Sequence, residues 1–238
     1  MRSIKHAAVA VALTAVLASC SDDTQSGTDP GTSQTGTPTT EVAAGCQKAA
    51  DSEGTALTPG CWAIQLPEVA GPQAELDLPA GFFGSDWGVW MDPPKPEDWG
   101  NIALRMTGDV YRNPCHPVGS PPKIGPTVED FTRALGAQKL TRTTAPVPVE
   151  VDGHAGLYVE VSVRAAVDLS GCQDQQLVLW QGPSDEIPQL THEFVRRYWV
   201  LDVDGQRVVL AVTSYPSATE EAVERFTGIV ESATFAEG

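Results

Sequence analysis

The sequence predicts an α+β domain in which helices pack on an antiparallel β-sheet, preceded by a signal peptide and a disordered linker. Three observations support this prediction. Several runs alternate apolar and polar residues with the period of two that is typical of half-buried strands. Asp-Gly pairs join neighbouring runs in the manner of tight hairpins. Two further segments carry helix-capping residues followed by an apolar stripe.

The clearest strands are expected at residues 101–107 and 157–163. In the first run, one face would carry Ile102, Leu104 and Met106. In the second run, the apolar alternate positions are Leu157, Val159, Val161 and Val163. Side chains at alternate positions of a strand point to the same face, so each run should bury one face against a core.

Two Asp-Gly pairs predict hairpins. Asp204-Gly205 lies between two β-rich runs, and Asp152-Gly153 lies between two more. These runs are 199–203, 206–212, 147–151 and 157–163. Because Gly tolerates the positive φ of a type I′ turn, each pair favours a tight antiparallel connection.

A first helix is expected to begin after Thr127. Thr127 can cap it, and Asp130 occupies the reciprocal position of a capping box. One face of this helix would be apolar, with Val128, Phe131 and Leu135. Gly136 suits the end of the helix.

A second helix is expected after Ser217, because Ser217 and Glu220 have the spacing of an S-x-x-E capping box. An apolar stripe follows, made of Ala222, Val223, Phe226, Ile229 and Val230. Residues 232–235 are expected to form a short last strand.

Three segments of the C-terminal half also carry a resemblance, namely 146–160, 199–205 and 229–235. Together they resemble uncharacterised actinobacterial lipoproteins and, more distantly, domains of the PsbP/Mog1 type. The resemblance covers roughly residues 75–238 and lies in element order and turn signals. It implies an antiparallel sheet with helices on both faces, and a role in binding partners or assisting assembly. It supplies no functional residue by position.

The first residues predict export. Arg2 and Lys5 give a positive start, and an apolar run of 12 residues follows at 7–18. That run is too short to span about 30 Å of hydrocarbon as a helix and is typical of a signal peptide, residues 1–19. The run ends in Leu17-Ala18-Ser19-Cys20, which resembles the bacterial lipobox.

The lipobox resemblance implies cleavage before Cys20 and a diacylglycerol on its thiol, which would anchor the chain to the outer face of the cell membrane. The alternatives are an ordinary cleaved signal with a chance cysteine, or a transmembrane helix. Residues 20–41 should then form a lipid-anchored flexible linker, because 21–40 contain no aliphatic or aromatic residue. Residues 42–238 are expected to form a single globular domain.

Charge limits the partners. Without residues 1–19, 13 basic residues face 31 acidic ones, and the formal charge moves from −16 to −18. No basic stripe is visible in the sequence. Such a domain is expected to repel nucleic acid and anionic lipid head groups, so no nucleic-acid partner is predicted.

Four cysteines remain besides Cys20, and an even number in an oxidising compartment predicts two disulfides. We favour Cys46–Cys61 and Cys115–Cys172 among the three pairings that are open. A zinc site is the alternative, but the short C-x₂₋₄-C spacing of such sites is absent.

No catalytic motif is recognisable. The nucleophile elbow G-x-S-x-G and the phosphate-binding loop G-x-x-x-x-G-K-[ST] are both absent from the sequence. His116, His154 and His192 are far apart and lack metal-ligand spacing. Acid pairs could be drawn from Asp86, Asp92, Asp98 and Glu193, as from any acidic chain. We therefore assign no catalytic residue, no metal ligand and no cofactor.

The aromatic segment 82–99 is the most unusual stretch and the candidate binding patch. Trp87 and Trp90 are expected on opposite faces of a strand, so that one of them enters the core. Trp99 follows a Pro-rich turn and is expected to be exposed. Aromatic side chains beside polar groups can form a ligand or partner surface, although core packing is the more common use of such residues.

These features predict a membrane-anchored extracytoplasmic module that binds or assembles without catalysis. A protein in the cell envelope is the candidate partner. The alternatives are an extracytoplasmic hydrolase and a small-ligand carrier. Histidines converging in one cleft would favour the enzyme, and an apolar cavity under residues 82–99 would favour the carrier. A flat aromatic patch would favour protein binding.

Overall fold

The computed structural model describes residues 45–52, 54–66, 71–85, 87–93, 95–182 and 188–237. These all belong to one compact unit, Ala44–Gly238. The predicted signal peptide, Cys20 and the linker lie outside the described residues. Within the described residues, no helix has the length and apolar character needed to cross a membrane.

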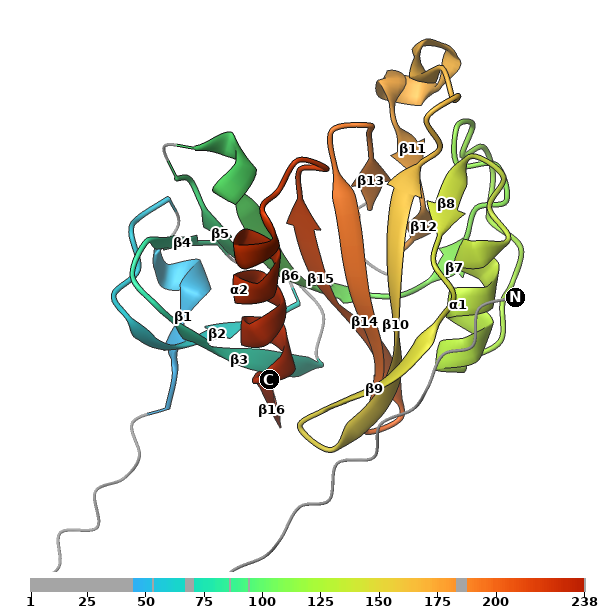
Figure 1. Cartoon of the computed structure of the whole chain (residues 1–238). Coiled ribbons are helices and arrows are strands. Elements are labelled where there is room, and N and C mark those ends of the chain that lie inside the picture. The colour runs from blue at the N-terminus through green and yellow to red at the C-terminus, as the bar shows by residue number, and fades with distance from the viewer. Residues whose placement is uncertain are drawn as a thin grey trace, which may run out of the picture. The chain divides into compact units, whose positions relative to one another are not determined.

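A large antiparallel sheet of eight strands forms the centre of this unit (Figure 1). Its strand order is β4 (Phe82–Gly84), β5 (Gly88–Met91), β6 (Gly100–Met106), β15 (Gln206–Ser214), β14 (Val195–Val203), β10 (His154–Val163) and β8 (Thr141–Thr143). The eighth strand, β9 (Val147–Val151), pairs with β10 on the edge opposite β14, the edge that β8 also joins. The α+β class with an antiparallel sheet is therefore confirmed.

A smaller sheet combines strands from both ends of the unit. Its order is β1 (Gln47–Lys48), β2 (Gly60–Ile64), β3 (Pro72–Leu78) and β16 (Thr234–Glu237). β1 and β2 are parallel and the other pairs are antiparallel. Two short ladders complete the strands, and they pair β7 (Asp109–Val110) with β12 (Trp180–Gln181), and β11 (Leu177–Val178) with β13 (Gln189–Leu190).

The two expected helices are present. α1 (Val128–Gly136) has the predicted capping box, in which the Thr127 hydroxyl accepts from Asp130 N–H and Asp130 accepts from Thr127 N–H. α2 (Glu220–Glu231) begins later than the Ser217 box predicted. Its cap is Thr219, whose hydroxyl accepts from Ala222 N–H at 3.1 Å. Short 3₁₀ turns lie at Ala49–Ser52, Pro96–Asp98, Leu169–Gly171 and Gln173–Gln175.

Both predicted hairpins form tight turns with positive φ at each central residue. The angles are 52° and 80° at Asp204 and Gly205, and 51° and 77° at Asp152 and Gly153. The first turn joins β14 to β15 and the second joins β9 to β10. Asp202 strengthens the first turn by accepting a hydrogen bond from Gly205 N–H at 2.8 Å.

The large sheet buries two different cores, one on each face. On the face that we call the first face, α2 and the small sheet pack on alternate residues of β4, β5, β6, β15 and β14. The largest members of this core include Trp199, Phe82 and Phe226. The core is apolar throughout because these strands alternate as the sequence predicted, with Ile102 and Leu104 fully buried.

The opposite, second face is covered by α1 and the short ladders, mainly over β10, β14 and β15. Its core includes Phe131 and Leu135 of α1, together with Trp180 and Tyr198. The predicted apolar alternation of β10 is confirmed, because Val159 and Val161 are fully buried in this core.

Candidate functional site

The segment 82–99 builds one end of the large sheet and leaves several aromatic rings on the second face. Phe82 and Val89 point into the first core, so their neighbours Phe83 and Trp90 point to the second face. The Phe83 and Trp90 rings stack with centroids 6.0 Å apart. Trp87 also stacks with Trp90, with ring centroids 6.2 Å apart and only 11° between the planes.

The expectation that either Trp87 or Trp90 enters the core is therefore wrong, because both are half-buried on the same side. Trp87 precedes β5 and so does not follow the strand alternation. Ser85 N–H donates to the Gly88 carbonyl at 2.9 Å and closes the connection between β4 and β5. The Arg105 guanidinium lies over the Trp87 ring at 5.2 Å, a cation–π arrangement.

A second aromatic cluster stands at the end of β6, β15 and β14. Trp99 lies 5.2 Å from Tyr215 and 5.5 Å from Phe194, and Phe194 and Tyr215 are 5.5 Å apart. All three are half-buried, so Trp99 is less exposed than expected. Since Gly100 pairs with Ser214, Trp99 and Tyr215 extend neighbouring strands on the second face.

We call these six side chains the aromatic face, and they are Phe83, Trp87, Trp90, Trp99, Phe194 and Tyr215. Phe83 and Trp90 are directly opposite each other on neighbouring strands, and further cross-strand pairs extend this line across the sheet. Trp90 pairs with Asn101, Asn101 pairs with Thr213, and Thr213 pairs with Arg196. Tyr198 lies two residues further along β14, on the same face.

Buried polar atoms lie on the same strands as these rings. Among the described residues, Asn101 Oδ1, Thr213 Oγ1 and Arg196 Nε have no hydrogen bond, and the buried Tyr198 hydroxyl has only an interaction with the Arg196 side chain. Thr213 is 2% exposed and Tyr198 is fully buried. We call these four residues the polar centre. Buried polar groups in folded proteins nearly always have a partner, so a cluster without partners needs a functional explanation.

Tyr198 is the most deeply buried member of the polar centre. Burial raises the pKa of its hydroxyl to about 12, although the charges of Arg196 and Arg105 and the hydrogen bond with Arg196 act in the opposite direction. The hydroxyl therefore stays protonated at neutral pH and can donate a hydrogen bond. Together the polar centre offers hydroxyl and guanidinium donors and an amide oxygen acceptor.

Sequence reasoning found Trp87, Trp90 and Trp99 but missed the other parts of this surface. Phe194 and Tyr215 lie in other strand ends, and no local motif connects them to residues 82–99. A signal was present in the strands themselves, because Asn101, Thr213 and Arg196 are polar residues near the ends of mostly apolar runs. Only the register of the sheet shows that these positions coincide.

The histidines do not form a joint site. His154 packs edge-on against Phe235 with ring centroids 5.4 Å apart, and His192 Nε2 lies 2.8 Å from the Val167 carbonyl. His116 Nε2 lies 3.8 Å from Cys115 Sγ. Within the described residues, no hydrogen bond or ion pair joins these imidazoles to one another or to a carboxylate.

The acidic candidates are equally dispersed. Asp86 lies outside the described residues, and Asp92 and Glu193 are exposed. Asp98 accepts a hydrogen bond from the Thr219 hydroxyl at 3.1 Å and so supports the start of α2. None of these contacts has the form of an acid–base pair.

The cysteines form the two pairs that the sequence favoured, Cys46–Cys61 and Cys115–Cys172, with Cα atoms 4.9 and 4.5 Å apart. In the described part of the chain, one group has the spacing of metal ligands, namely Cys46, Cys61 and Glu75. Both of its sulfur atoms are held in a disulfide. Thiolate ligation of zinc is therefore not available there.

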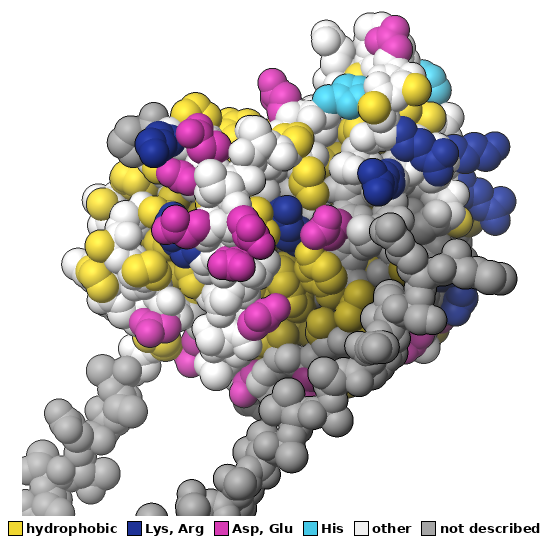
Figure 2. All heavy atoms as spheres, viewed as in Figure 1, with side chains coloured by type: hydrophobic (Ala, Val, Ile, Leu, Met, Phe, Trp, Pro, Cys, Tyr) yellow, Lys and Arg dark blue, Asp and Glu magenta, His cyan; other side chains and the backbone are white. Residues whose placement is uncertain are grey.

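The exposed cations are less evenly spread than the sequence suggested. Six of them lie between positions 112 and 164, on and around α1 and β8, and they are Arg112, Lys123, Arg133, Lys139, Arg142 and Arg164. Figure 2 shows Lys and Arg side chains gathered on one side of the unit and Asp and Glu side chains over α2. The net negative charge thus conceals a basic region.

A cavity of about 360 Å³ lies beside α1 within this basic region. It is lined by residues of the segments 110–112, 122–125 and 130–137. Two further hollows lie next to Gly108 and Pro148. None of the three is lined by the aromatic segment 82–99.

Fold and geometry together define an α+β domain with a candidate binding surface on one sheet face. No family model matches the chain. No curated protein sequence matches it. Among solved structures, the crystal structure of LpqN, involved in cell envelope biogenesis of Mycobacterium tuberculosis, is similar with a TM-score of 0.38 and 13% sequence identity, covering 73% of this chain and 89% of LpqN. At that level of similarity, we base neither fold nor function on it, and the PsbP/Mog1-like resemblance stays a prediction.

Proposed function

We propose that this chain is a membrane-anchored extracytoplasmic binding module without catalytic activity, and that the aromatic face contacts its ligand or protein partner in the cell envelope. The observation that carries the proposal is the polar centre, in which Asn101 Oδ1, Thr213 Oγ1 and Arg196 Nε are buried without a hydrogen bond among the described residues, on strands that also carry half-buried rings. A bound molecule that supplied hydrogen bonds there would recover the free energy that burial costs, about 1–3 kcal/mol for each group.

The aromatic face has the composition of an interaction surface. Trp and Tyr are enriched where binding energy is concentrated, because their rings offer a large apolar area together with a polar handle. Stacked rings are also held in place by one another, so little conformational freedom is lost on binding. A PsbP/Mog1-like domain would be consistent with such a role, since that resemblance implies partner binding or assembly.

The compartment rests on the N-terminal sequence and is supported by the two disulfides, which suit an oxidising environment. If Cys20 carries the diacylglycerol, Cys20→Ser should release the protein from the membrane fraction or leave it unprocessed. Metabolic labelling with a radioactive fatty acid tests this directly. Label that persists on the Cys20→Ser protein would falsify the lipid anchor.

The binding surface can be tested by photo-crosslinking in intact cells. A crosslinking amino acid placed at Trp99 should capture a discrete partner. The same amino acid at Val118, which is 82% exposed and outside the aromatic face, should not. The double substitution Trp87→Ala and Trp90→Ala should abolish the crosslink from position 99 while the protein remains folded. Equal capture from positions 99 and 118 would contradict the proposed surface.

A further inference from the structure

The cavity beside α1 is independent of the aromatic face and has a fixed wall. Ile124 N–H donates to Asp109 Oδ1 at 3.0 Å, which holds the segment 122–125 in place. Arg207 reaches across from β15 and donates to the carbonyls of Gly125 and Thr127, both at 2.8 Å. The cavity is therefore formed before any ligand arrives, and its volume lies within the usual range for small-molecule sites.

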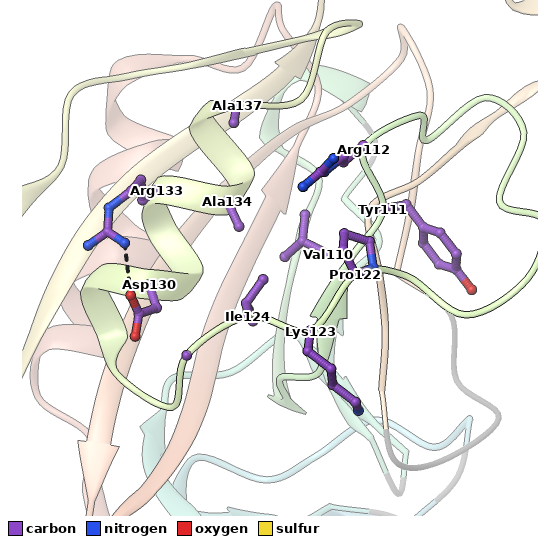
Figure 3. A pocket seen from close by; sticks show the side chains of 11 residues that line it. Val110, Tyr111, Arg112, Pro122, Lys123, Ile124, Asp130, Arg133, Ala134 and Ala137 are labelled. Atoms are coloured by element: carbon purple, nitrogen blue, oxygen red, sulfur yellow. Dashed lines mark hydrogen bonds and ion pairs between the residues drawn. The ribbon is translucent and has the colours of Figure 1, made fainter.

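Its lining is mostly apolar with one cation directed inward. Val110, Ile124 and Ala134 face the hollow, and the Arg112 side chain extends across it towards α1 (Figure 3). Within the described residues, Arg112 has no hydrogen bond or ion pair. The guanidinium is thus free to bind an anion.

The other charged groups at the cavity are already engaged. Arg133 turns away from it and pairs with Asp130 at 2.8 Å (Figure 3). Lys123 also points away and pairs with Asp109 at 2.7 Å. The Arg133 guanidinium holds the pKa of the Asp130 carboxyl below its usual value. Asp130 therefore stays ionised and bound to Arg133 at neutral pH, which leaves Arg112 as the cation available to a ligand.

The surroundings favour the same sign of ligand. Arg112, Lys123 and Arg133 line the cavity with Asp130 as the one acid of its lining, so the lining carries a net positive charge on a negatively charged protein. Figure 2 shows Lys and Arg side chains gathered on one side of the unit. A net positive lining raises the local concentration of anions. Charge and shape therefore agree on an anion that also carries an apolar part.

We propose that this cavity binds a small amphipathic anion, whose carboxylate or phosphate pairs with Arg112 while its hydrocarbon part lies on Val110, Ile124 and Ala134. Arg is suited to both head groups because its planar fork can donate two parallel hydrogen bonds. The apolar lining stabilises the hydrocarbon in proportion to the area removed from water. Neither contact involves the aromatic face.

Calorimetric titration of the full chain carrying Cys20→Ser tests the proposal without detergent. The probes are octanoate, octyl phosphate, octanol and octylammonium, which share the hydrocarbon and differ in the head group. We expect saturable binding of at least one anion, at least tenfold tighter than octanol and octylammonium. The two anionic probes separate a carboxylate site from a phosphate site. Failure of both anions to bind, or equal binding of octylammonium, would overturn the proposal.

Matched variants locate the site. Arg112→Gln should weaken binding of the anion at least tenfold, whereas Arg142→Gln, an exposed arginine outside the cavity lining, should change it less than twofold. Ala134→Leu should fill the cavity and abolish binding of the anion. Thermal melts show whether each variant is folded, and Arg112→Gln remains informative if Ala134→Leu is not. Unchanged affinity in folded Arg112→Gln would overturn the assignment.

One further variant separates this site from the proposed function. The double substitution Trp87→Ala and Trp90→Ala should leave affinity for the anion unchanged. Anion binding without any crosslink from position 99, even with Trp87 and Trp90 intact, would support the cavity site and contradict the aromatic face as a binding surface. A crosslink from position 99 without anion binding would contradict the cavity site alone.

Discussion

The two faces of the large sheet treat polar side chains differently, and neighbouring residues of β14 show the contrast. Arg197 points to the first face, where it lies 3.3 Å from Glu160 and donates to the Ser214 hydroxyl at 2.8 Å. Arg196 points to the second face. The Nε atoms of both arginines lack a hydrogen bond among the described residues. The difference lies in the carboxylate, because Arg197 has Glu160 beside it whereas the interaction found for Arg196 is with the neutral Tyr198 hydroxyl.

Two tyrosines repeat this contrast. On the first face, the Tyr158 hydroxyl donates to Glu160 at 2.7 Å. On the second face, the fully buried Tyr198 hydroxyl has no carboxylate partner among the described residues, and its contact is with Arg196. The first face thus pairs its tyrosine and its arginine with Glu160. The second face keeps buried polar atoms without a hydrogen bond, such as Asn101 Oδ1 and Thr213 Oγ1, on the strands that also carry half-buried rings.

The largest loss of stability should come from removing a large side chain from the core on the first face. Phe226 of α2 is fully buried and packs edge-on against Phe82 at 5.8 Å. Phe226→Ala should lower the free energy of unfolding by about 3–5 kcal/mol. Urea denaturation measures this loss, with the exposed Glu224→Ala of the same helix as control. A loss below about 1 kcal/mol would mean that the first face is not the main core.

The next effect concerns the Cys115–Cys172 disulfide, which links two segments packed on the second face. Cys172 is buried in that core, and Cys115 packs against it. Replacing both cysteines with Ala should lower the free energy of unfolding by about 2–5 kcal/mol. Denaturation of the double variant measures this loss. Peptide mapping without reduction checks the pairing itself, and a linked peptide containing Cys46 and Cys115 would refute it.

A smaller effect on the free energy of unfolding should depend on pH, because Asp109 accepts a hydrogen bond from Ile124 N–H in the wall of the cavity. Partial burial alone would raise the pKa of the Asp109 carboxyl. Hydrogen bonds from Lys123 and Ile124 N–H, with the charges of Lys123 and Arg207, outweigh this and lower the pKa below its ordinary 3.8. The stabilisation by the ionised carboxylate is therefore present above the unfolded pKa and is lost as pH falls through the folded value.

Asp109→Asn should accordingly cost about 1 kcal/mol at pH 7. The difference in unfolding free energy between wild type and variant should shrink between about pH 5 and pH 2. Urea denaturation across this range measures it. A difference that grows on acidification would show that the sign of the pKa shift is wrong.

The smallest effect is the sharpest test of the polar centre. Thr213→Val removes a buried hydroxyl without a partner and keeps the side-chain shape, so it should raise the free energy of unfolding by about 1 kcal/mol. Thr132 is the matched control, because its equally buried hydroxyl donates to the Val128 carbonyl at 3.1 Å. Thr132→Val should destabilise the protein instead. Thr213→Val should also weaken the crosslink from position 99, and destabilisation by Thr213→Val would indicate a partner inside the protein.

Local signals in the sequence were sufficient for the elements that depend on neighbouring residues. The two Asp-Gly hairpins, the Thr127 cap and the alternation of β6 and β10 all follow from contacts within a few positions. The start of α2 was misplaced because Ser217 and Thr219 are both good caps. Asp98, which accepts from Thr219 and is distant in the chain, helps to hold Thr219 in that role.

The candidate site was only partly predictable. Trp87 and Trp90 were visible as an aromatic-rich segment, but their common side depends on the connection between β4 and β5. The polar centre depends on strand register, since Asn101, Thr213 and Arg196 are adjacent only across three strands. The basic region was hidden for a related reason, because net charge says nothing about how cations are distributed in space.

The pairing of β16 with β3 has a consequence for the order of folding. Phe235 and Ala74 are neighbours in the small sheet but lie 161 positions apart in the chain. The hairpins of the large sheet close short loops. Pairing β16 with β3 closes a much longer loop, and the chain therefore loses more conformational entropy. The hairpins can therefore form first from local contacts, whereas the pairing of β16 with β3, like that of β6 with β15, forms only when distant segments meet. Refolding should show a slow final phase that reports on Trp62 of β2, because contacts between distant segments slow the folding of β-rich domains.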